Sequence, residues 1–245
     1  MRTRTVLNHD YARIRARSKR DNDPAYLADF TDTQRPWEAF RPVGDWRKRA
    51  FDVALAALIL LLLSPLFAMV MVLIRMSSPG PTLYGHERIG RGGRSFKCLK
   101  FRTMVPNGDE ILAAYLAANP DAEEEWKATR KLRVDPRVTV VGSVLRKTSV
   151  DELPQLINIL RGEMSLVGPR PVVFDELRYY GPRKVHYLAA RPGLTGLWQV
   201  SGRSDTSYDQ RVSFDCHYCE NWTFVSDLLL IVRTVPAVLS RRGTY

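Results

Sequence analysis

Two adjacent carboxylates offer the clearest chemistry in this sequence. Asp151 and Glu152 lie in the stretch "TSVDELPQL", ahead of a segment with helical periodicity. One interpretation is structural, because Ser149 and Glu152 have the spacing of a capping box and Pro154 suits the first turn of a helix. The other is catalytic: one carboxylate acts as a nucleophile, and the second helps to hold a hard cation such as Mg²⁺. The residues alone leave both interpretations open.

Three cationic side chains have spacings that suit phosphate binding. In "SLVGPRPVV", Pro169 and Pro171 fix extended backbone on either side of Arg170. A guanidinium held in this way can bind two phosphate oxygens at once, although a rigid surface loop would have the same sequence. In "CLKFRTM", Lys100 and Arg102 have strand spacing and therefore point to one face. Their alternative role is to supply charge at a membrane surface.

Other reactive side chains give weaker signals. Cys216 and Cys219 form a C-x-x-C pair without the second pair that a zinc site needs, and the chain has only three cysteines. His86 and His186 have no evident partner in the sequence, so structural roles are expected for both. The Gly-rich stretch "RPGLTGLWQVSGRSD" matches neither a P-loop nor a dinucleotide-binding fingerprint. These residues predict no metal site and no nucleotide-binding motif, and the few cysteines fit a reducing compartment.

An uncharged stretch covers residues 53–74 and must be buried either in a membrane or in a protein core. As a straight helix it would be about 33 Å long, which is close to the ~30 Å hydrocarbon thickness of a bilayer. Pro65 lies at its centre and cannot donate a backbone hydrogen bond, and Ser64 can bond a carbonyl that the break frees. A single kinked span and a hairpin that re-enters the same face are both compatible with this pattern.

The charges at both ends of this stretch favour the hairpin. Basic residues near membrane segments prefer the cytoplasmic side, and both flanks are basic. We therefore predict a re-entrant helix with two arms of about 12 residues, each roughly 18 Å long and reaching near the midplane. The flanking basic residues are Arg47, Lys48 and Arg49 before the stretch, and Arg75, Arg88, Arg91, Arg94, Lys97, Lys100 and Arg102 after it.

The rest of the chain predicts a helix-rich α+β fold in three parts. Residues 1–45 form a basic tail without sustained periodicity, for which we expect disorder; the membrane element covers 46–78 and the catalytic domain 79–245. Gly92 and Gly93 suggest a turn between two short strands. A helical face comprising Leu153, Leu156, Ile157 and Leu160 ends at Gly162, and "VSDLLLIVRTVPAVL" forms an amphipathic helix too short to span.

The net charge of +11 indicates a polyanionic partner, which could be nucleic acid, anionic lipid or a phosphate-rich ligand. Nucleic acid is the weakest of these, because no binding motif is present and aromatic residues do not alternate with the basic runs. Lipid and phosphate both agree with the apolar stretch and with the cationic side chains described above.

Several long motifs in fixed order resemble those of the bacterial sugar transferases, the monotopic phosphoglycosyl transferases. They are "KRAFDVALA", "SSPGP", "KFRTM", "DPRVT", "RKTSVDELPQLINILRGEMSLVGPRP" and "RPGLTGLWQVSGR", together with the break at Ser64 and Pro65. The resemblance runs from about Lys48 to the C-terminus. The sequence departs from the family in "YGHERIG", where His86 replaces the usual Gln, which puts a side-chain role at that position in doubt.

The resemblance implies transfer of a sugar 1-phosphate from a UDP-sugar to undecaprenyl phosphate, with release of UMP. It assigns Asp151 as the nucleophile, which would form a covalent aspartyl-phosphosugar intermediate, with Glu152 as its partner and Mg²⁺ at the pair. It implies a re-entrant membrane helix at the cytoplasmic face of the bacterial inner membrane, and a homodimer is compatible with it. The further positions that it carries over are Lys100, Arg102 and Arg170 near the phosphates, Gln199 and Arg203 for the nucleotide sugar, and Asp215 and Asp227 in the C-terminal part.

The expected function is therefore the first membrane step of exopolysaccharide, capsule or O-antigen synthesis. The stretch "GLWQVSGRSD" favours galactose 1-phosphate, with glucose 1-phosphate as the alternative. A non-catalytic membrane scaffold for polysaccharide assembly is a rival of a different class, and the presence of Asp151, Glu152 and Arg170 argues against it.

Overall fold

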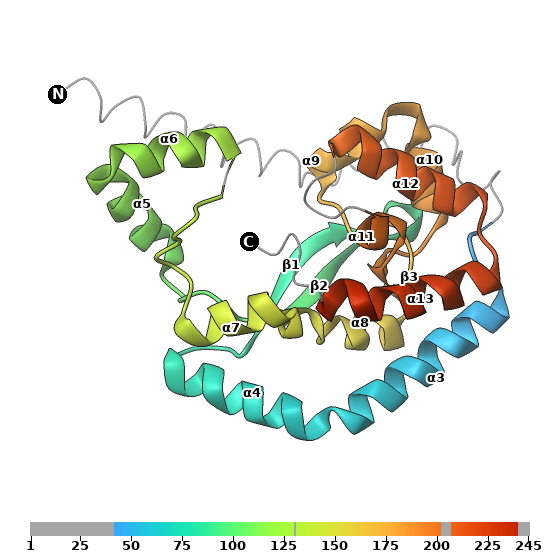
Figure 1. The fold of residues 1–245 in the computed structure, drawn as a ribbon, viewed down its shortest axis with the longest axis horizontal. Coiled ribbons are helices and arrows are strands. Elements are labelled where there is room, and N and C mark those ends of the chain that lie inside the picture. Colours follow the sequence, from blue (N-terminus) through green and yellow to red (C-terminus); the bar gives the residue numbers. More distant parts are fainter. Residues whose placement is uncertain (1–41, 130, 202–206, 240–245) are drawn as a thin grey trace.

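The computed structural model describes residues 42–129, 131–201 and 207–239 and confirms a helix-rich α+β fold (Figure 1). β1 (Leu83–Ile89) and β2 (Ser95–Phe101) form an antiparallel pair, and β3 (Ser165–Val167) and β4 (Gly193–Thr195) form a parallel pair. The helices are α3 (Trp46–Leu62), α4 (Ser64–Ser77), α5 (Gly108–Ala118), α6 (Pro120–Thr129), α7 (Val140–Thr148), α8 (Gln155–Arg161), α9 (Phe174–Leu177), α10 (Lys184–Ala189), α11 (Leu197–Ser201), α12 (Tyr208–Glu220) and α13 (Phe224–Leu239). Three short 3-10 helices, η1 (Arg91–Gly93), η2 (Val150–Glu152) and η3 (Arg178–Arg183), connect them.

Helices α3 and α4 form a wide V along one edge of the molecule (Figure 1). The chain bends by 62° between them, at Leu63, and Pro65 lies in the first turn of α4. The Ser64 hydroxyl donates to the Leu61 carbonyl at 2.8 Å, so it satisfies a carbonyl at the break as the sequence predicts. Within the described residues no helix alone has the length and apolar character to cross a membrane, whereas the bent pair together meets both criteria.

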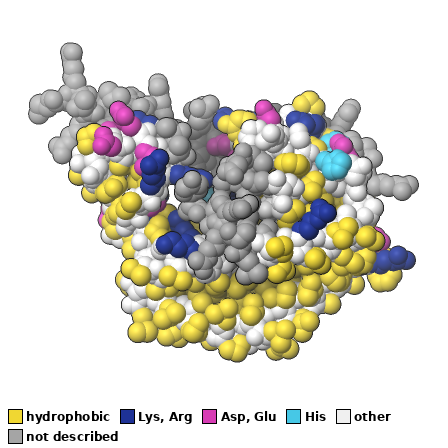
Figure 2. All heavy atoms as spheres, in the orientation of Figure 1, with side chains coloured by type: hydrophobic (Ala, Val, Ile, Leu, Met, Phe, Trp, Pro, Cys, Tyr) yellow, Lys and Arg dark blue, Asp and Glu magenta, His cyan; other side chains and the backbone are white. Residues whose placement is uncertain are grey.

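An apolar surface runs along the same edge (Figure 2). It includes large side chains of both arms of the V, such as Leu61, which is 71% exposed. Helix α13 adds a stripe of exposed residues with helical spacing, and α7 adds two more, so each presents an apolar face to the surface. These additional residues are Val225, Leu228, Leu229, Val232 and Val235 of α13, and Val140 and Val144 of α7.

The β1–β2 hairpin carries Arg88 and Lys100 and packs against helices. Its turn contains Gly92 and Gly93 with φ of 68° and 76°, a left-handed conformation that glycine adopts without strain, as the sequence predicts. Phe101 of β2 is buried against Val70 and Ile74 of α4 and Leu145 of α7. The hairpin is therefore held directly by the second arm of the V.

Helix α8 lies beneath the hairpin and differs in part from expectation. It runs from Gln155 to Arg161, and Gly162 forms the predicted left-handed cap with φ of 82°. The predicted apolar face is wrong in part, because Leu160 is 38% exposed whereas Ile159 is completely buried. The buried face also contains a polar residue, Asn158, whose side chain accepts from Leu99 N and donates to Lys97 O of β2.

Candidate active site

A tight turn presents the two carboxylates. Ser149 ends α7 in a left-handed conformation with φ of 56°, and Asp151 and Glu152 follow on η2. The capping-box interpretation is wrong, because the Ser149 side chain makes no capping hydrogen bond and α8 begins only after Pro154. The carboxylates thus lie on a short turn between two helices, and helix capping does not account for them.

Lys100 lies against this acidic pair. Its Nζ atom is 2.6 Å from Glu152 Oε1 and 3.9 Å from Asp151 Oδ2, although the lysine lies on β2, about fifty residues earlier. Asp151 is 8% exposed, and its burial raises its pKa to about 6, while the Lys100 cation opposes that shift. Burial disfavours the Lys100 cation too, but the charges of Glu152 and Asp151 and the hydrogen bond to Glu152 together outweigh it, so the pKa of Lys100 is raised. The result is a poorly solvated carboxylate beside a lysine that stays charged.

Arg170 lies in the loop after β3, where three contacts position it. Its guanidinium is 3.6 Å from Glu176 and lies over the Trp198 ring at 5.6 Å. Its backbone N–H donates to the buried Asp215 carboxylate at 3.4 Å, and Tyr180 donates to the same carboxylate at 2.6 Å. Burial raises the pKa of Asp215 to about 7, and the hydrogen bond from Tyr180 opposes the rise. The hydrogen bond that Asp215 accepts from the Arg170 backbone thus helps to fix the position of this loop.

Arg102 has a different environment from Lys100. Its guanidinium donates to the carbonyls of Ser78 and Pro79 and to the Ser78 hydroxyl, with distances of 2.8 to 2.9 Å. It is 9% exposed, and these contacts hold the loop that follows α4. The structure therefore brings Lys100, but not Arg102, to the carboxylate pair.

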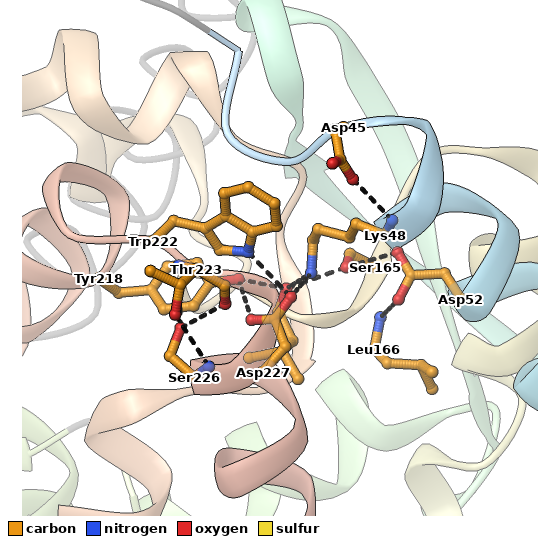
Figure 3. Close-up of polar contacts among 11 residues, drawn as sticks. Asp45, Lys48, Asp52, Ser165, Leu166, Tyr218, Trp222, Thr223, Ser226 and Asp227 are labelled. Atoms are coloured by element: carbon orange, nitrogen blue, oxygen red, sulfur yellow. Dashed lines mark hydrogen bonds and ion pairs between the residues drawn. The ribbon is translucent and has the colours of Figure 1, made fainter.

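Asp227 belongs to a buried network at the start of α3 (Figure 3). It accepts from Lys48 at 2.6 Å, from Tyr218 at 2.8 Å and from Trp222 at 2.9 Å. Lys48 also donates to Val167 O of β3 at 2.9 Å. The network joins the start of α3 to β3 and α13, and these contacts of Asp227 are structural.

A second carboxylate of α3 contributes to the same junction. Asp52 accepts from the Ser165 hydroxyl at 2.7 Å and from Leu166 N at 3.1 Å (Figure 3). Burial raises the pKa of Asp52, with Lys48 opposing the shift. Of the two remaining candidates, Gln199 lies half-buried on α11, and Arg203 falls outside the described residues.

The sequence reasoning missed Arg88 on β1. Arg88 is close enough to Glu176 and Arg170 for their charges to interact, and burial lowers its pKa. His86, two residues earlier on the same face, has its pKa lowered by burial and by the cations of Arg88 and Lys100. The strand alternation in "YGHERIG" was the available signal, since it places both side chains on one face.

The carboxylate pair fits Mg²⁺ better than a metal held entirely by protein. Among residues 42–129, 131–201 and 207–239, no group of three or more His, Cys, Asp or Glu side chains could enclose an ion. Asp151 and Glu152 supply oxygen donors, and the Glu152 side chain is 41% exposed. Mg²⁺ commonly uses one or two carboxylates and completes its shell with water and substrate phosphates. Asp151 and Glu152 are a pair of carboxylates of the kind that Mg²⁺ uses in this way.

Comparison with known proteins identifies the same family over most of the chain. The family model for bacterial sugar transferases matches residues 43–241. The exopolysaccharide production protein ExoY of Rhizobium meliloti is 60% identical over 207 residues, which cover 84% of this chain and 92% of that protein. The undecaprenyl-phosphate galactose phosphotransferase of Salmonella typhimurium is 50% identical over 81% of this chain and 41% of its own length. The UDP-glucose:undecaprenyl-phosphate glucose-1-phosphate transferase of Caulobacter vibrioides is 43% identical over 84% of this chain and 74% of its own length.

Proposed function

Since the chain belongs to the bacterial sugar transferase family, we propose that it transfers a hexose 1-phosphate from a UDP-sugar to undecaprenyl phosphate and releases UMP. The observation that carries the proposal is the contact of Lys100 with Asp151 and Glu152, because it combines a buried carboxylate, a second carboxylate and a fixed cation. A carboxylate can form a covalent intermediate, and the other two groups can meet the charge of a diphosphate.

The transfer proceeds by two displacements. An Asp151 oxygen attacks the phosphorus that carries the sugar, and an oxygen–phosphorus bond forms. The bond from that phosphorus to the bridging oxygen breaks, and UMP leaves with the electron pair. A phosphate oxygen of undecaprenyl phosphate then attacks the same phosphorus, and the Asp151 carboxylate is regenerated. The soluble and the lipid substrate therefore need not meet in one complex.

The cationic side chains of the site can neutralise the negative charge of the substrate diphosphate. Lys100 lies beside the attacking carboxylate, and Arg88 and Arg170 lie within interaction range of each other and of Glu176. A guanidinium can bind phosphate oxygens through two parallel hydrogen bonds. Mg²⁺ bound by Asp151 and Glu152 would neutralise charge on the diphosphate as UMP leaves.

The apolar edge supports attachment to the cytoplasmic face of the inner membrane. α3 has 17 residues and α4 has 14. They are therefore about 25 and 21 Å long. With a bend of 62°, a symmetric V whose two ends lie at one level would reach roughly 11–13 Å deep. That is less than half of the ~30 Å hydrocarbon core, so the wedge would stay in one leaflet and not reach the midplane. The active-site turn would then face the phosphate headgroups.

Galactose 1-phosphate is the first candidate for the transferred group. The Salmonella galactose phosphotransferase is 50% identical to this chain, and the Caulobacter glucose-1-phosphate transferase is 43% identical. Glucose 1-phosphate is the alternative. The name of the Rhizobium relative points to exopolysaccharide production as the pathway.

The test is UMP release in detergent or nanodiscs with UDP-galactose, UDP-glucose and UDP-N-acetylglucosamine in turn. With the correct sugar, enzyme alone should release a burst of about one UMP per active site, and undecaprenyl phosphate should allow continuous turnover. Mass spectrometry of the peptide that contains Asp151 should detect the sugar phosphate. UMP that appears only after the lipid is added would replace the covalent route with a single displacement. No UMP with any sugar would support the non-catalytic scaffold.

A further inference from the structure

A basic cavity lies at the tip of the β1–β2 hairpin. It has a volume of about 660 Å³ and is lined by the turn, the end of α8 and residues 188–191. Ser95 of β2 lines it, whereas Lys100 of the same strand contacts the carboxylate pair. Five residues of strand separate the two positions by roughly 17 Å. The cavity is therefore distinct from the site of phosphoryl transfer.

Four arginines and one acid give this cavity its charge. Arg91, Arg94, Arg161 and Arg191 line it, and Glu163 is the only carboxylate among its lining residues. The Glu163 side chain already accepts from Asn158 at 2.6 Å. Over the part of the chain that the structure describes, none of the four arginines takes part in an ion pair, and the cluster therefore carries uncompensated positive charge.

The positions of these arginines are fixed by the fold. Arg191 donates from Nε to the Gly162 carbonyl at 2.9 Å, which leaves its terminal nitrogens available. Arg49 of α3 approaches from the same side and donates to the carbonyls of Ile159 and Leu160. Burial lowers the pKa of Arg191, and the neighbouring cations of Arg91 and Arg49 lower it further. Bringing these cations together costs free energy that an anion would recover.

We propose that this cavity, the arginine pocket, binds a phosphate-bearing anion. Guanidinium groups match phosphate oxygens in pairs, and four of them converge here. The volume is in the range of small-molecule sites and accepts an organic phosphate. Such an anion is either a soluble phosphate or the headgroup of an anionic phospholipid. Arg161 ends α8 next to Leu160, which is 38% exposed, and the lipid source rests on the membrane attachment proposed above.

The experiment compares two variants of the full chain that remove the same charge. The test variant carries Arg91→Gln and Arg94→Gln at the exposed hairpin tip. The control carries Lys127→Gln and Arg133→Gln, two exposed positions outside the pocket. Arg161→Gln is an independent test from a different element, in case the hairpin changes affect folding. Melting curves of all variants check that they fold.

Two binding measurements distinguish the sources of phosphate. The soluble arm titrates pyrophosphate by calorimetry without divalent cations. The lipid arm measures co-sedimentation with vesicles of phosphatidylcholine alone or mixed equally with phosphatidylglycerol. Each arginine near an anionic surface contributes about fivefold in affinity, so the test variant should bind about 30-fold more weakly than the control in one arm. UMP release measured on the same variants separates this proposal from the transferase proposal.

Two results would support the proposal, and a third would overturn it. Loss of pyrophosphate binding in the test variant and in Arg161→Gln, with vesicle binding equal to the control, identifies a soluble phosphate. Loss of the preference for phosphatidylglycerol identifies a lipid headgroup. If both pocket variants behave like the control in both arms, the pocket binds no phosphate and the proposal is overturned, even if UMP release is normal.

Discussion

Replacing Asp151 with Asn should abolish turnover and also stabilise the fold at neutral pH. Asn keeps the size of the side chain but has no nucleophilic oxyanion, so neither UMP nor the covalent intermediate should form. The stabilisation follows from burial, because Asp151 is 8% exposed and its pKa is raised from 3.8 to about 6. A pKa raised in the folded state means that folding disfavours the ionised carboxylate, so the wild type loses stability as pH rises from about 4 to above 6.

The size of the effect follows from that shift. About two pKa units correspond to roughly 3 kcal/mol at pH 8 and to almost nothing below pH 4, where both forms are neutral. Loss of the Lys100 contact at 3.9 Å reduces the gain, so 1–3 kcal/mol is expected, or about 2–12 °C in melting temperature for a chain of this size. Melting curves in detergent at several pH values measure it.

The control and the refuting result are both simple. Asp109→Asn makes the same change at an exposed carboxylate on α5 and serves as the matched control. The reasoning fails if Asp151→Asn melts below the wild type at pH 8, or if its advantage is the same at pH 4 and pH 8. Retained UMP release by a folded Asp151→Asn protein would remove Asp151 as the nucleophile.

Three further changes test the parts that position the site. Replacing Ser64 and Pro65 together with Leu should straighten the bent pair and favour a spanning form, so cysteines placed at its two ends should be labelled from opposite sides instead of one. Deleting residues 1–41 should leave UMP release intact and weaken vesicle binding by at most ~1 kcal/mol per basic residue removed; loss of turnover in a folded deletion would assign this segment a catalytic role. Lys48→Met should lower stability by about 3–5 kcal/mol in melting experiments, since it leaves the Asp227 carboxylate buried without its cation, and an added Asp227→Leu change should restore part of the loss.

Features set by local backbone chemistry were predictable from the sequence. The bend at Pro65 and the hairpin turn at Gly92 depend on what single residues can adopt, and both occur where expected. The boundary of the tail was less accurate. The structure extends ordered contacts back to Val43, whose N–H donates to Ala189 O, and Asp45 caps α3 by accepting from Lys48 N. Both contacts lie inside the predicted tail of residues 1–45, which is why the deletion above stops at residue 41.

Features set by distant partners were not predictable. Ser149 and Glu152 have the spacing of a capping box, but Ser149 adopts a left-handed conformation and Glu152 pairs with Lys100 from another element. Arg88 joins the site only because the hairpin packs beside the Arg170 loop. Spacing in the sequence describes a side chain relative to its own helix or strand, and these contacts depend on how the elements pack together.

The buried network at the start of α3 would allow the proposed membrane wedge to set the height of the active site. Lys48 binds Asp227 of α13 and Val167 O of β3 at once, and Asp52 binds the backbone and side chain at the start of β3. Tilting α3 against the catalytic domain would separate a charged pair inside a low-dielectric region, which is strongly unfavourable. The strand held in this way leads within three residues to Arg170. The tilt of α3 and the position of the Arg170 loop are therefore coupled.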